Sequence, residues 1–306
     1  MKRNENSHMN RDEFIEKLKA NQLEHHLAEF EALARPCIRL YLAKEDEGNI
    51  LVGSSKIGGR PDLPLTVEWP YETERPFNER DLRFKQRPVK NELLPLSFVA
   101  QINLSEVSQL DEENLLPKSG MVYFFYSAEQ KVWGFDPRDY SGFKIIYYDG
   151  DMSKLVRHRP PANLPEYARF TSCSIQPRLE TNYPPPFLDE LRFLSEEELD
   201  LYDRSFEEFP VNKIFGYADI VQDEMELECE LVTNGLYCGD ATGYNDPKRQ
   251  TLEANIDQWK LLLQIDSNEE DCGMMWGDVG RIYYWIRKDD LLNKQFDKAW
   301  LILQCS

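Results

Sequence analysis

The acidic residues near position 270 are the group whose types and spacing could most directly support catalysis. Asp266 and Asp278 enclose a run of three further acidic residues at 269–271. Carboxylates this close together can hold Mg²⁺ or Ca²⁺, or act as a general acid and a general base. The spacing is not that of an EF-hand, and a solvated loop also explains the run. Asp266, Asp278 and the neighbouring Trp276 are therefore candidate ligand-binding residues.

A second candidate is the loop that begins at Lys56. Gly58 and Gly59 would let backbone amides approach an anion, and Lys56 would add positive charge. The loop has neither the spacing of a Walker loop nor that of a dinucleotide-binding loop. The alternative is a tight turn leading into a strand. We favour this turn, because a similar stretch at Lys213 keeps Gly216 but has no second glycine.

Two glutamines occupy similar places inside apolar runs. Gln101 follows Phe98-Val99-Ala100, and Gln264 follows Leu261-Leu262-Leu263. A buried amide without partners costs roughly 1–3 kcal/mol, so each glutamine must find hydrogen bonds. We expect each to bond to a neighbouring loop, in particular the Lys-Ile-Gly turn of its own part of the chain. A ligand contact is the alternative interpretation.

Other catalytic and cofactor signatures are missing from the sequence. The six cysteines include no C-x-x-C pair, and the four histidines include no H-E-x-x-H pattern. A G-x-S-x-G nucleophile motif is also missing. We therefore predict no cofactor, no metal site and no catalytic residues, so that an enzyme is the less favoured interpretation. Scattered cysteines without a secretion signal predict reduced thiols and a cytoplasmic location.

The chain is strongly acidic, with a formal net charge of −19 over 306 residues. Such a surface is repelled by nucleic acids and by anionic membranes, so neither is expected as a partner. The sequence also has no apolar run of about 18 residues, which a membrane-spanning helix needs. The acidity either serves solubility or presents a surface to a basic protein, as an immunity protein or inhibitor would.

Four sequence blocks recur in the same order in two parts of the chain. The paired blocks begin at Ser55 and Asn212, at Ala100 and Leu263, at Gly120 and Gly280, and at Phe143 and Lys298. The lysine and the glutamine of the two copies are 45 and 51 residues apart, and the glutamine and the glycine are 19 and 16 apart. An internal duplication explains this order, with a unit far longer than that of a solenoid or propeller.

Hydrophobic periodicity predicts the main elements. Residues 11–35 have a helical pattern, capped by Asn10, with a break near Asn21 and a stop at Pro36. Alternating or aromatic runs of strand length predict strands at 37–43, 50–53, 96–102, 121–126, 143–148, 259–266, 281–287 and 299–305. In the second copy, Asp223 and Glu226 form a capping-box spacing, and a further helix is expected from Asp246 to about 258.

The stretch between the two copies is rich in proline. Pro177 and the run 184–186 belong to this segment, and such a density opposes a place inside a sheet. We expect it to connect the copies and to pack across both, with a short acidic helix capped by Ser195.

These motifs together resemble a known family. The residues that carry the resemblance are Ser55-Lys56-Ile57-Gly58-Gly59, Leu63-Pro64, Trp69-Pro70, Phe98, Gln101-Ile102-Asn103, Leu116-Pro117, Gly120 and Trp276-Gly277-Asp278 with Gly280. The chain is similar to the YwqG-like family of bacterial proteins over nearly its whole length after the N-terminal tail. The resemblance implies a β-rich fold and no known reaction. The second copy departs from the pattern at Phe215 and Ala218, which stand where the first copy has glycine and proline.

The sequence thus predicts a β-dominated α+β protein in which two homologous antiparallel halves form one globule. The segments are an N-terminal tail and helical part (1–35), a first repeat (36–150), a proline-rich connector (151–210) and a second repeat (211–306). The expected function is that of a cytoplasmic binding protein with a basic protein partner. The alternative is a metal-assisted hydrolase that uses Asp266 and Asp278.

Overall fold

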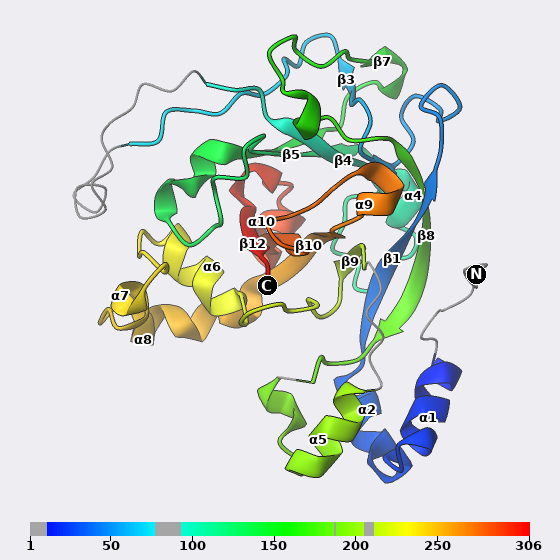
Figure 1. Cartoon of the computed structure of the whole chain (residues 1–306), viewed down its shortest axis with the longest axis vertical. Helices are drawn as coiled ribbons and strands as arrows, with labels where there is room; N and C mark the ends of the chain where they lie inside the picture. Colours follow the sequence, from blue (N-terminus) through cyan, green and yellow to red (C-terminus); the bar gives the residue numbers. More distant parts are fainter. Residues whose placement is uncertain (1–10, 77–92, 187, 205–210) are drawn as a thin grey trace.

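A ten-stranded, fully antiparallel sheet organises the chain in the computed structural model, which describes residues 11–76, 93–186, 188–204 and 211–306 (Figure 1). Its strands are β1 (Arg35–Lys44), β2 (Lys56–Ile57), β4 (Ser97–Asn103), β5 (Met121–Tyr126), β6 (Phe143–Tyr148), β8 (Cys173–Asn182), β9 (Lys213–Phe215), β10 (Trp259–Asp266), β11 (Arg281–Arg287) and β12 (Trp300–Gln304). A separate two-stranded sheet pairs β3 (Asp62–Pro64) with β7 (Leu155–Arg157). The predicted β-dominated α+β class is confirmed.

The strand order has two similar wings around a central pair. The order is β12-β11-β10-β9-β1-β8-β2-β4-β5-β6, so β9 to β12 extend from β1 and β2 to β6 extend from β8. Each wing also has a register shift at the same place, between Phe98 and Ala100 in β4 and between Leu261 and Leu263 in β10. In each strand, the shift begins three residues before the glutamine, Gln101 or Gln264, and ends one residue before it. That the wings arose by duplication stays a prediction.

The two ends of the sheet approach each other, which nearly closes it. The backbone N–H of Leu303 in β12 donates to the carbonyl of Trp133, beyond β5, at 3.0 Å. Trp300 Nε1 donates to the carbonyl of Gly134 at 2.8 Å, and the Trp300 ring meets Phe143 of β6 edge to face. The interior is a single large hydrophobic core drawn from both wings.

Strand β8 corrects our expectation for the proline-rich connector. All ten residues of β8 pair with β1, and Pro177 lies opposite Leu40. The Leu40 N–H points away from β8 and donates to Asn212 on the β9 side. Pro177 therefore faces the other side of β8, where β2 pairs only with Cys173 and Ser174. A missing N–H costs no ladder bond there, so the proline is tolerated.

Aromatic side chains cover both faces of β5, as their alternation predicts. Every residue of β5 is buried. Phe124 belongs to the main core, whereas Tyr123 and Phe125 join a second cluster with Leu63 and Leu155 beneath the small sheet. Both faces of this strand are therefore covered by protein.

The predicted N-terminal helical segment forms a lobe of its own with a helix from the connector (Figure 1). It contains α1 (Arg11–Ala20), the 3₁₀ turn η1 (Glu24–His26), α2 (Leu27–Leu33) and α5 (Glu196–Asp203). A separate core that includes Phe14, Phe30 and Tyr202 holds these helices together. The break near Asn21 and the Ser195 cap of α5 are confirmed, whereas Asn10 lies outside the described residues.

The remaining helices are short and surround the sheet. They are α4 (Leu104–Val107), η2 (Pro137–Gly142), η3 (Met152–Lys154), η4 (Glu166–Ala168), η5 (Asp189–Leu191), α6 (Glu226–Thr233), α7 (Ala241–Tyr244), α8 (Arg249–Leu252), η6 (Glu253–Gln258), α9 (Glu269–Cys272), α10 (Lys288–Leu292) and η7 (Phe296–Lys298). In the described part of the chain, no helix has the length and apolar character to span a membrane.

Two local predictions are wrong. The expected strand at 50–53 is a turn region, because its carbonyls serve other groups: Leu51 accepts from Ser54, and Ile50 accepts from Arg157. The expected capping box before α6 does not form either. The helix begins at Glu226 with Met225 as its N-cap and no side-chain cap.

Candidate functional site

The first polar cluster surrounds Gln101 and lies between β4 and the turn that begins at Lys56. The Gln101 amide oxygen accepts from the Asp62 N–H, and its nitrogen donates to the Ser54 carbonyl and to Asp62 Oδ2. Gln101 is fully buried, and its amide oxygen and nitrogen are thus bonded within the chain. Tyr123 adds a hydrogen bond from its hydroxyl to the Asp62 carbonyl.

Charged groups complete this cluster. Lys56 is buried, with Nζ 3.2 Å from Asp62 Oδ2 and 3.6 Å from Glu47 Oε1. Arg157 donates from Nε to Asp62 Oδ1 at 2.8 Å. Burial alone would raise the pKa of Asp62, but the Arg157 hydrogen bond and the Lys56 charge outweigh it and lower the pKa. Burial lowers the pKa of Lys56, and the Asp62 charge opposes this effect.

A similar cluster surrounds Gln264 in the other wing. Its amide bonds to the Asp219 N–H, to Asp219 Oδ2 and to the Val211 carbonyl. Lys213 is buried, with Nζ 2.7 Å from Asp219 Oδ2, and the Tyr283 hydroxyl donates to the Asp219 carbonyl. In both wings the glutamine and the lysine bind the same aspartate, in the position we expected for a fold-supporting residue.

The Gly58-Gly59 turn has left-handed backbone angles and closely packed surroundings. The φ angles are +68° and +72°, and a Cβ on Gly58 would lie 2.1 Å from the Thr171 carbonyl oxygen. The Gly58 N–H donates to the Val99 carbonyl, and the Gly59 N–H donates to the Phe170 carbonyl. An anion would therefore have to displace backbone carbonyls to reach these amides.

The acidic residues near position 270 lie in different environments, some buried and some exposed. Asp266 is buried and accepts from Val211 N, Ser267 N and Arg281 Nε, the last at 2.7 Å. The Trp276 ring is also buried and donates from Nε1 to the Asp266 carbonyl at 3.1 Å. Asp278, in contrast, is exposed. The Asp266 carboxylate is thus already neutralised by Arg281.

A pocket between the two wings gathers charged and aromatic side chains that the sequence analysis did not select. It is lined by Arg35, Pro36, Cys37, Ile38, Leu110, Asp111, Glu112, Glu113, Phe215, Gly216, Glu226, Trp259, Lys260, Leu261 and Trp285. We call it the acidic pocket, because its lining residues include four carboxylates and only two cations. Its volume is about 40 Å³. A water molecule needs about 10–15 Å³ by this measure, so the pocket accepts a few waters or the end of one side chain.

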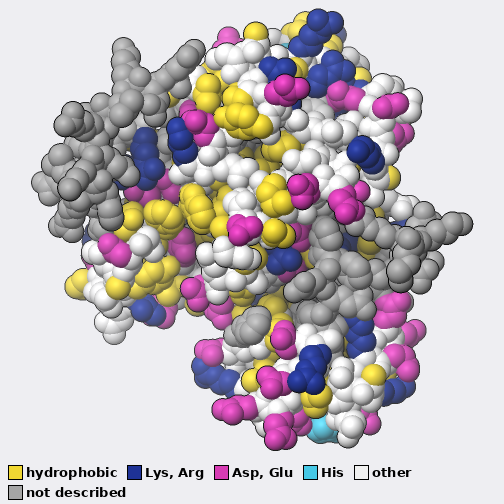
Figure 2. All heavy atoms as spheres, in the orientation of Figure 1, with side chains coloured by type: hydrophobic (Ala, Val, Ile, Leu, Met, Phe, Trp, Pro, Cys, Tyr) yellow, Lys and Arg dark blue, Asp and Glu magenta, His cyan; other side chains and the backbone are white. Residues whose placement is uncertain are grey.

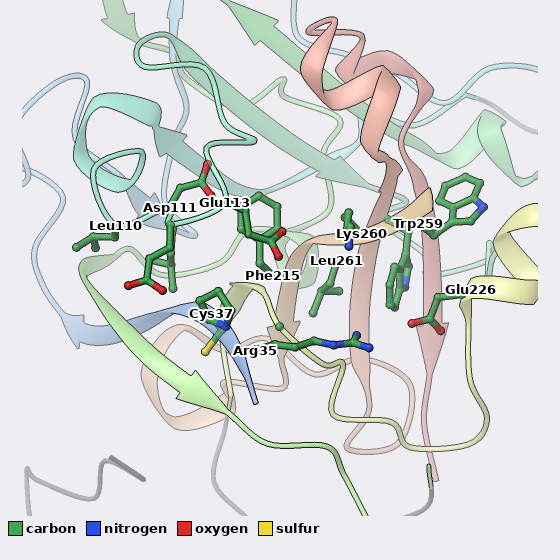
Figure 3. Close-up of a pocket in the computed structure, with 15 residues that line it drawn as sticks. Arg35, Cys37, Leu110, Asp111, Glu113, Phe215, Glu226, Trp259, Lys260 and Leu261 are labelled. Carbon is green, nitrogen blue, oxygen red and sulfur yellow. The ribbon is translucent and has the colours of Figure 1, made fainter. Parts of the chain in front are cut away.

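The carboxylates approach the acidic pocket from two directions (Figure 3). Asp111 and Glu113 come from the loop after α4, and Glu226 comes from the start of α6, on the other side of the pocket. Arg35 extends from β1 toward the Glu226 side. The pocket thus combines a loop of the first wing with a helix of the second.

Two lining residues carry buried polar atoms without a partner. Among the described residues, neither Asp111 Oδ1 nor Trp285 Nε1 has a hydrogen-bond partner, although Asp111 Oδ2 accepts from Leu116 N at 2.7 Å. An unpaired buried polar atom costs about 1–3 kcal/mol. Such atoms occur where water or a ligand supplies the missing bond.

Glu226 lacks a strong counter-charge. Burial is the main cause that raises the pKa of Glu226, and the Glu224 charge adds to it. The backbone N–H groups of Glu226 and Met225 and the Arg35 charge lower the pKa but do not outweigh burial. No ion pair joins Glu226 to a lysine or arginine of the described chain. Arg35 instead lies over the Tyr217 ring, 3.9 Å from its centre, and 4.0 Å from Glu190. The pocket therefore contains carboxylates that its own cations leave partly unbalanced.

A second pocket lies beside the Gly58-Gly59 turn of the first wing. It has a volume of about 260 Å³ and is lined by Glu47, Gly59, Arg60, Trp69, Phe98, Pro160, Leu164, Ala168, Arg169, Phe170, Thr171 and Ser172. Gly59 and Phe98 stand where Gly216 and Leu261 stand in the acidic pocket. Its charged groups have partners within the chain, because Arg60 pairs with Glu47 and Arg169 donates to the Leu164 carbonyl. This pocket is larger than the acidic pocket, but its charged side chains are already bonded within the chain and do not indicate a ligand.

The face of the molecule drawn in Figure 2 does not concentrate its negative charge. Figure 2 shows acidic and basic side chains interspersed over the visible face. The acidic pocket is therefore a more specific candidate for recognising a basic partner than the net charge of −19. Sequence reasoning missed it because Glu226 was interpreted as a cap. The run Asp111-Glu112-Glu113 was a signal that could have indicated it.

The comparisons with known proteins show a family and no reaction. The family described as a domain of unknown function, DUF1963, matches residues 55–305. The chain therefore belongs to the DUF1963 family. No curated protein matches the chain. The N-terminal helices α1 and α2 and strand β1 lie before the matched range.

Proposed function

We propose that the chain is a binding protein that recognises a basic segment of a protein partner, with one arginine or lysine side chain entering the acidic pocket. The observation that carries the proposal is the unpaired buried Asp111 Oδ1, in a pocket whose opposite side carries Glu226, a carboxylate without an ion pair in the described chain. A guanidinium would donate hydrogen bonds to a carboxylate of the pocket and could stack on an indole that lines it. The small volume of the pocket suits the end of one side chain.

Electrostatics then determines how the partner binds. The overall negative charge attracts a basic partner over long range and raises the association rate at low salt. The pocket supplies the short-range specificity. Because burial raises the pKa of Glu226, a bound cation competes with a proton there, and binding tightens as the pH rises.

We also propose a narrower family, a cellular location and an origin for the chain. We assign it to the YwqG-like group of bacterial proteins on the strength of the motifs around Lys56, Gln101 and Trp276. We also propose a cytoplasmic location, since the six cysteines are free and buried, and an origin of the two wings by duplication. The hydrolase alternative has no comparable support, because Asp266 is bound to Arg281 and Asp278 is exposed.

A matched pair of peptides tests the proposal. One peptide carries a single arginine between glycines, and the other carries citrulline, which has the same shape without the charge. Titration calorimetry of the full chain should show binding of the arginine peptide, weaker at high salt, and none of the citrulline peptide. A single contact of this kind is expected near 1 mM, or about 4 kcal/mol. Equal affinity for both peptides would contradict the proposal.

A further inference from the structure

A group of two histidines and one glutamate lies in the helical lobe, away from the acidic pocket. His25 and His26 belong to η1, and Glu198 belongs to α5. One possible ligand atom of each residue lies within 4.8 Å of the others. Among the described residues, no other group of three or more histidine, cysteine or acidic side chains has this property. Our expectation from the sequence included no metal site.

Two distances in this group match those between the ligands of a tetrahedral ion. His25 Nε2 and His26 Nε2 lie 3.2 and 3.1 Å from the same atom, Glu198 Oε1. An ion with bonds of 2.0–2.1 Å holds neighbouring ligands about 3.3 Å apart. The His25 side chain is 58% exposed, so its ring can rotate to complete the geometry without disturbing the core.

The surroundings hold the ligands in place. Glu198 Oε2 accepts from Ser195 N at 2.8 Å and from Ser195 Oγ at 2.7 Å, which leaves Oε1 directed at the histidines. His26 also packs against Phe193, with ring centres 5.2 Å apart. Such outer contacts orient metal ligands in proteins.

We propose that His25, His26 and Glu198 bind a zinc-class divalent ion, with water as a fourth ligand. Two imidazoles favour Zn²⁺, Ni²⁺ or Co²⁺ over Mg²⁺ and Ca²⁺, which prefer oxygen ligands. The ion joins η1 to α5 across 172 residues of sequence. It therefore clamps the N-terminal helices to the connector helix and stabilises the lobe.

Cobalt and zinc titrations of the full chain, after removal of metal with a chelator, test the site. Co²⁺ should give the visible absorption of a tetrahedral nitrogen and oxygen site, and Zn²⁺ should displace it at one equivalent. Zn²⁺ should also raise the melting temperature. A thiolate charge-transfer band would show that the ion binds cysteine, and would overturn the proposal.

Conservative variants separate the site from general metal affinity. His25→Gln and Glu198→Gln should each weaken Zn²⁺ binding by more than about tenfold. His25→Gln changes an exposed side chain, so it should fold like the parent, as circular dichroism in chelator can verify. The matched control Glu24→Gln, in the same turn, should bind like the parent. Unchanged affinity in His25→Gln, or absence of binding by the parent, would overturn the proposal.

Discussion

Gln101 and Gln264 make the same three hydrogen bonds in opposite wings of the sheet. Each amide oxygen accepts from the N–H of an aspartate, at 2.8 Å from Asp62 and 2.9 Å from Asp219. Each amide nitrogen donates to Oδ2 of that aspartate, at 2.9 and 2.7 Å, and to a backbone carbonyl. The two amides thus fasten the loop before and after a short strand, β2 or β9, to the neighbouring long strand.

Replacement of either glutamine by leucine should destabilise the chain. Gln101→Leu and Gln264→Leu each remove the amide and leave the aspartate N–H and a carbonyl unpaired in the interior. We expect a loss of roughly 1–3 kcal/mol for each in the free energy of unfolding, measured by denaturant melts. Because the two sites share no partner, the double variant should show nearly the sum of the two losses.

Gln109→Leu is the matched control for these variants. Gln109 is exposed, so the same change in side-chain type should alter the free energy of unfolding by no more than about 0.5 kcal/mol. Wild-type stability in both Gln101→Leu and Gln264→Leu would show that the amides do not support the fold.

Gly58→Ala should be far more damaging than Gly235→Ala. Both glycines have positive φ, +68° and +86°, so alanine pays about 1–2 kcal/mol for the left-handed backbone at either site. At Gly58 the new Cβ would also lie 2.1 Å from the Thr171 carbonyl oxygen, whereas nothing lies within 4 Å at Gly235. Denaturant melts that gave equal losses would contradict the close packing of this turn.

Asp136 should contribute to acid sensitivity. Burial alone would raise its pKa, but hydrogen bonds from the Arg138 side chain and backbone, with the Arg75 charge, lower the pKa to about 2 from 3.8. A folded-state pKa below the unfolded value means that the ionised group stabilises the fold above pH 4. This contribution of about 2 kcal/mol should be lost as the pH falls from about 4 to 2.

The comparison of the parent with Asp136→Asn measures this effect. The parent should be the more stable protein at pH 6, and the difference between the two should shrink toward pH 2. A difference in unfolding free energy that does not change with pH would contradict the assignment.

Glu228 should have the opposite effect on the pH dependence of stability, because it favours the fold when protonated. Burial raises its pKa to about 7 from 4.5, although the Tyr244 hydroxyl donates to it at 3.3 Å. The fold is then favoured by the protonated form, so stability falls as the pH rises through about 7. Glu228→Gln removes this ionisation and should gain up to about 3 kcal/mol on the parent between pH 5 and pH 9.

Thermal or denaturant melts across this pH range check the prediction. Glu269→Gln, at an exposed position, controls for the loss of one negative charge. An identical pH dependence in the parent and Glu228→Gln would mean that Glu228 does not titrate in this range in the folded state.

The sequence predicted most strands because their signal is local. Trp259–Asp266 and Met121–Tyr126 have the expected bounds, since uninterrupted apolar and aromatic runs of this length fit a strand buried on both faces. The strand Cys173–Asn182 was missed, because its proline argued against a sheet. Only the register, with Pro177 facing the side that β2 leaves open, shows why it is tolerated.

The acidic pocket was harder to predict for a different reason. Asp111 and Glu226 are 115 positions apart in the sequence, and neither lies in a motif with characteristic spacing. The pocket exists because the loop after α4 in one wing and the start of α6 in the other line the same cavity. Local patterns cannot indicate a site that depends on how the wings pack. Gln101 and Gln264 could be found because each lies in a locally recognisable strand.

The most direct test of the proposed function changes charges of opposite sign in the same pocket. Glu226→Gln with Glu113→Gln removes two carboxylates, and Arg35→Gln removes a cation that competes with the incoming guanidinium. The control Glu68→Gln with Glu269→Gln removes two exposed carboxylates outside the pocket, and so alters the net charge equally.

Titration of these variants with the arginine peptide at low salt gives the decisive result. We predict that binding is lost in the first variant, strengthened in Arg35→Gln and nearly unchanged in the control. If the two double variants weaken binding equally, the peptide responds only to net charge. That result would contradict recognition of a basic side chain by the acidic pocket.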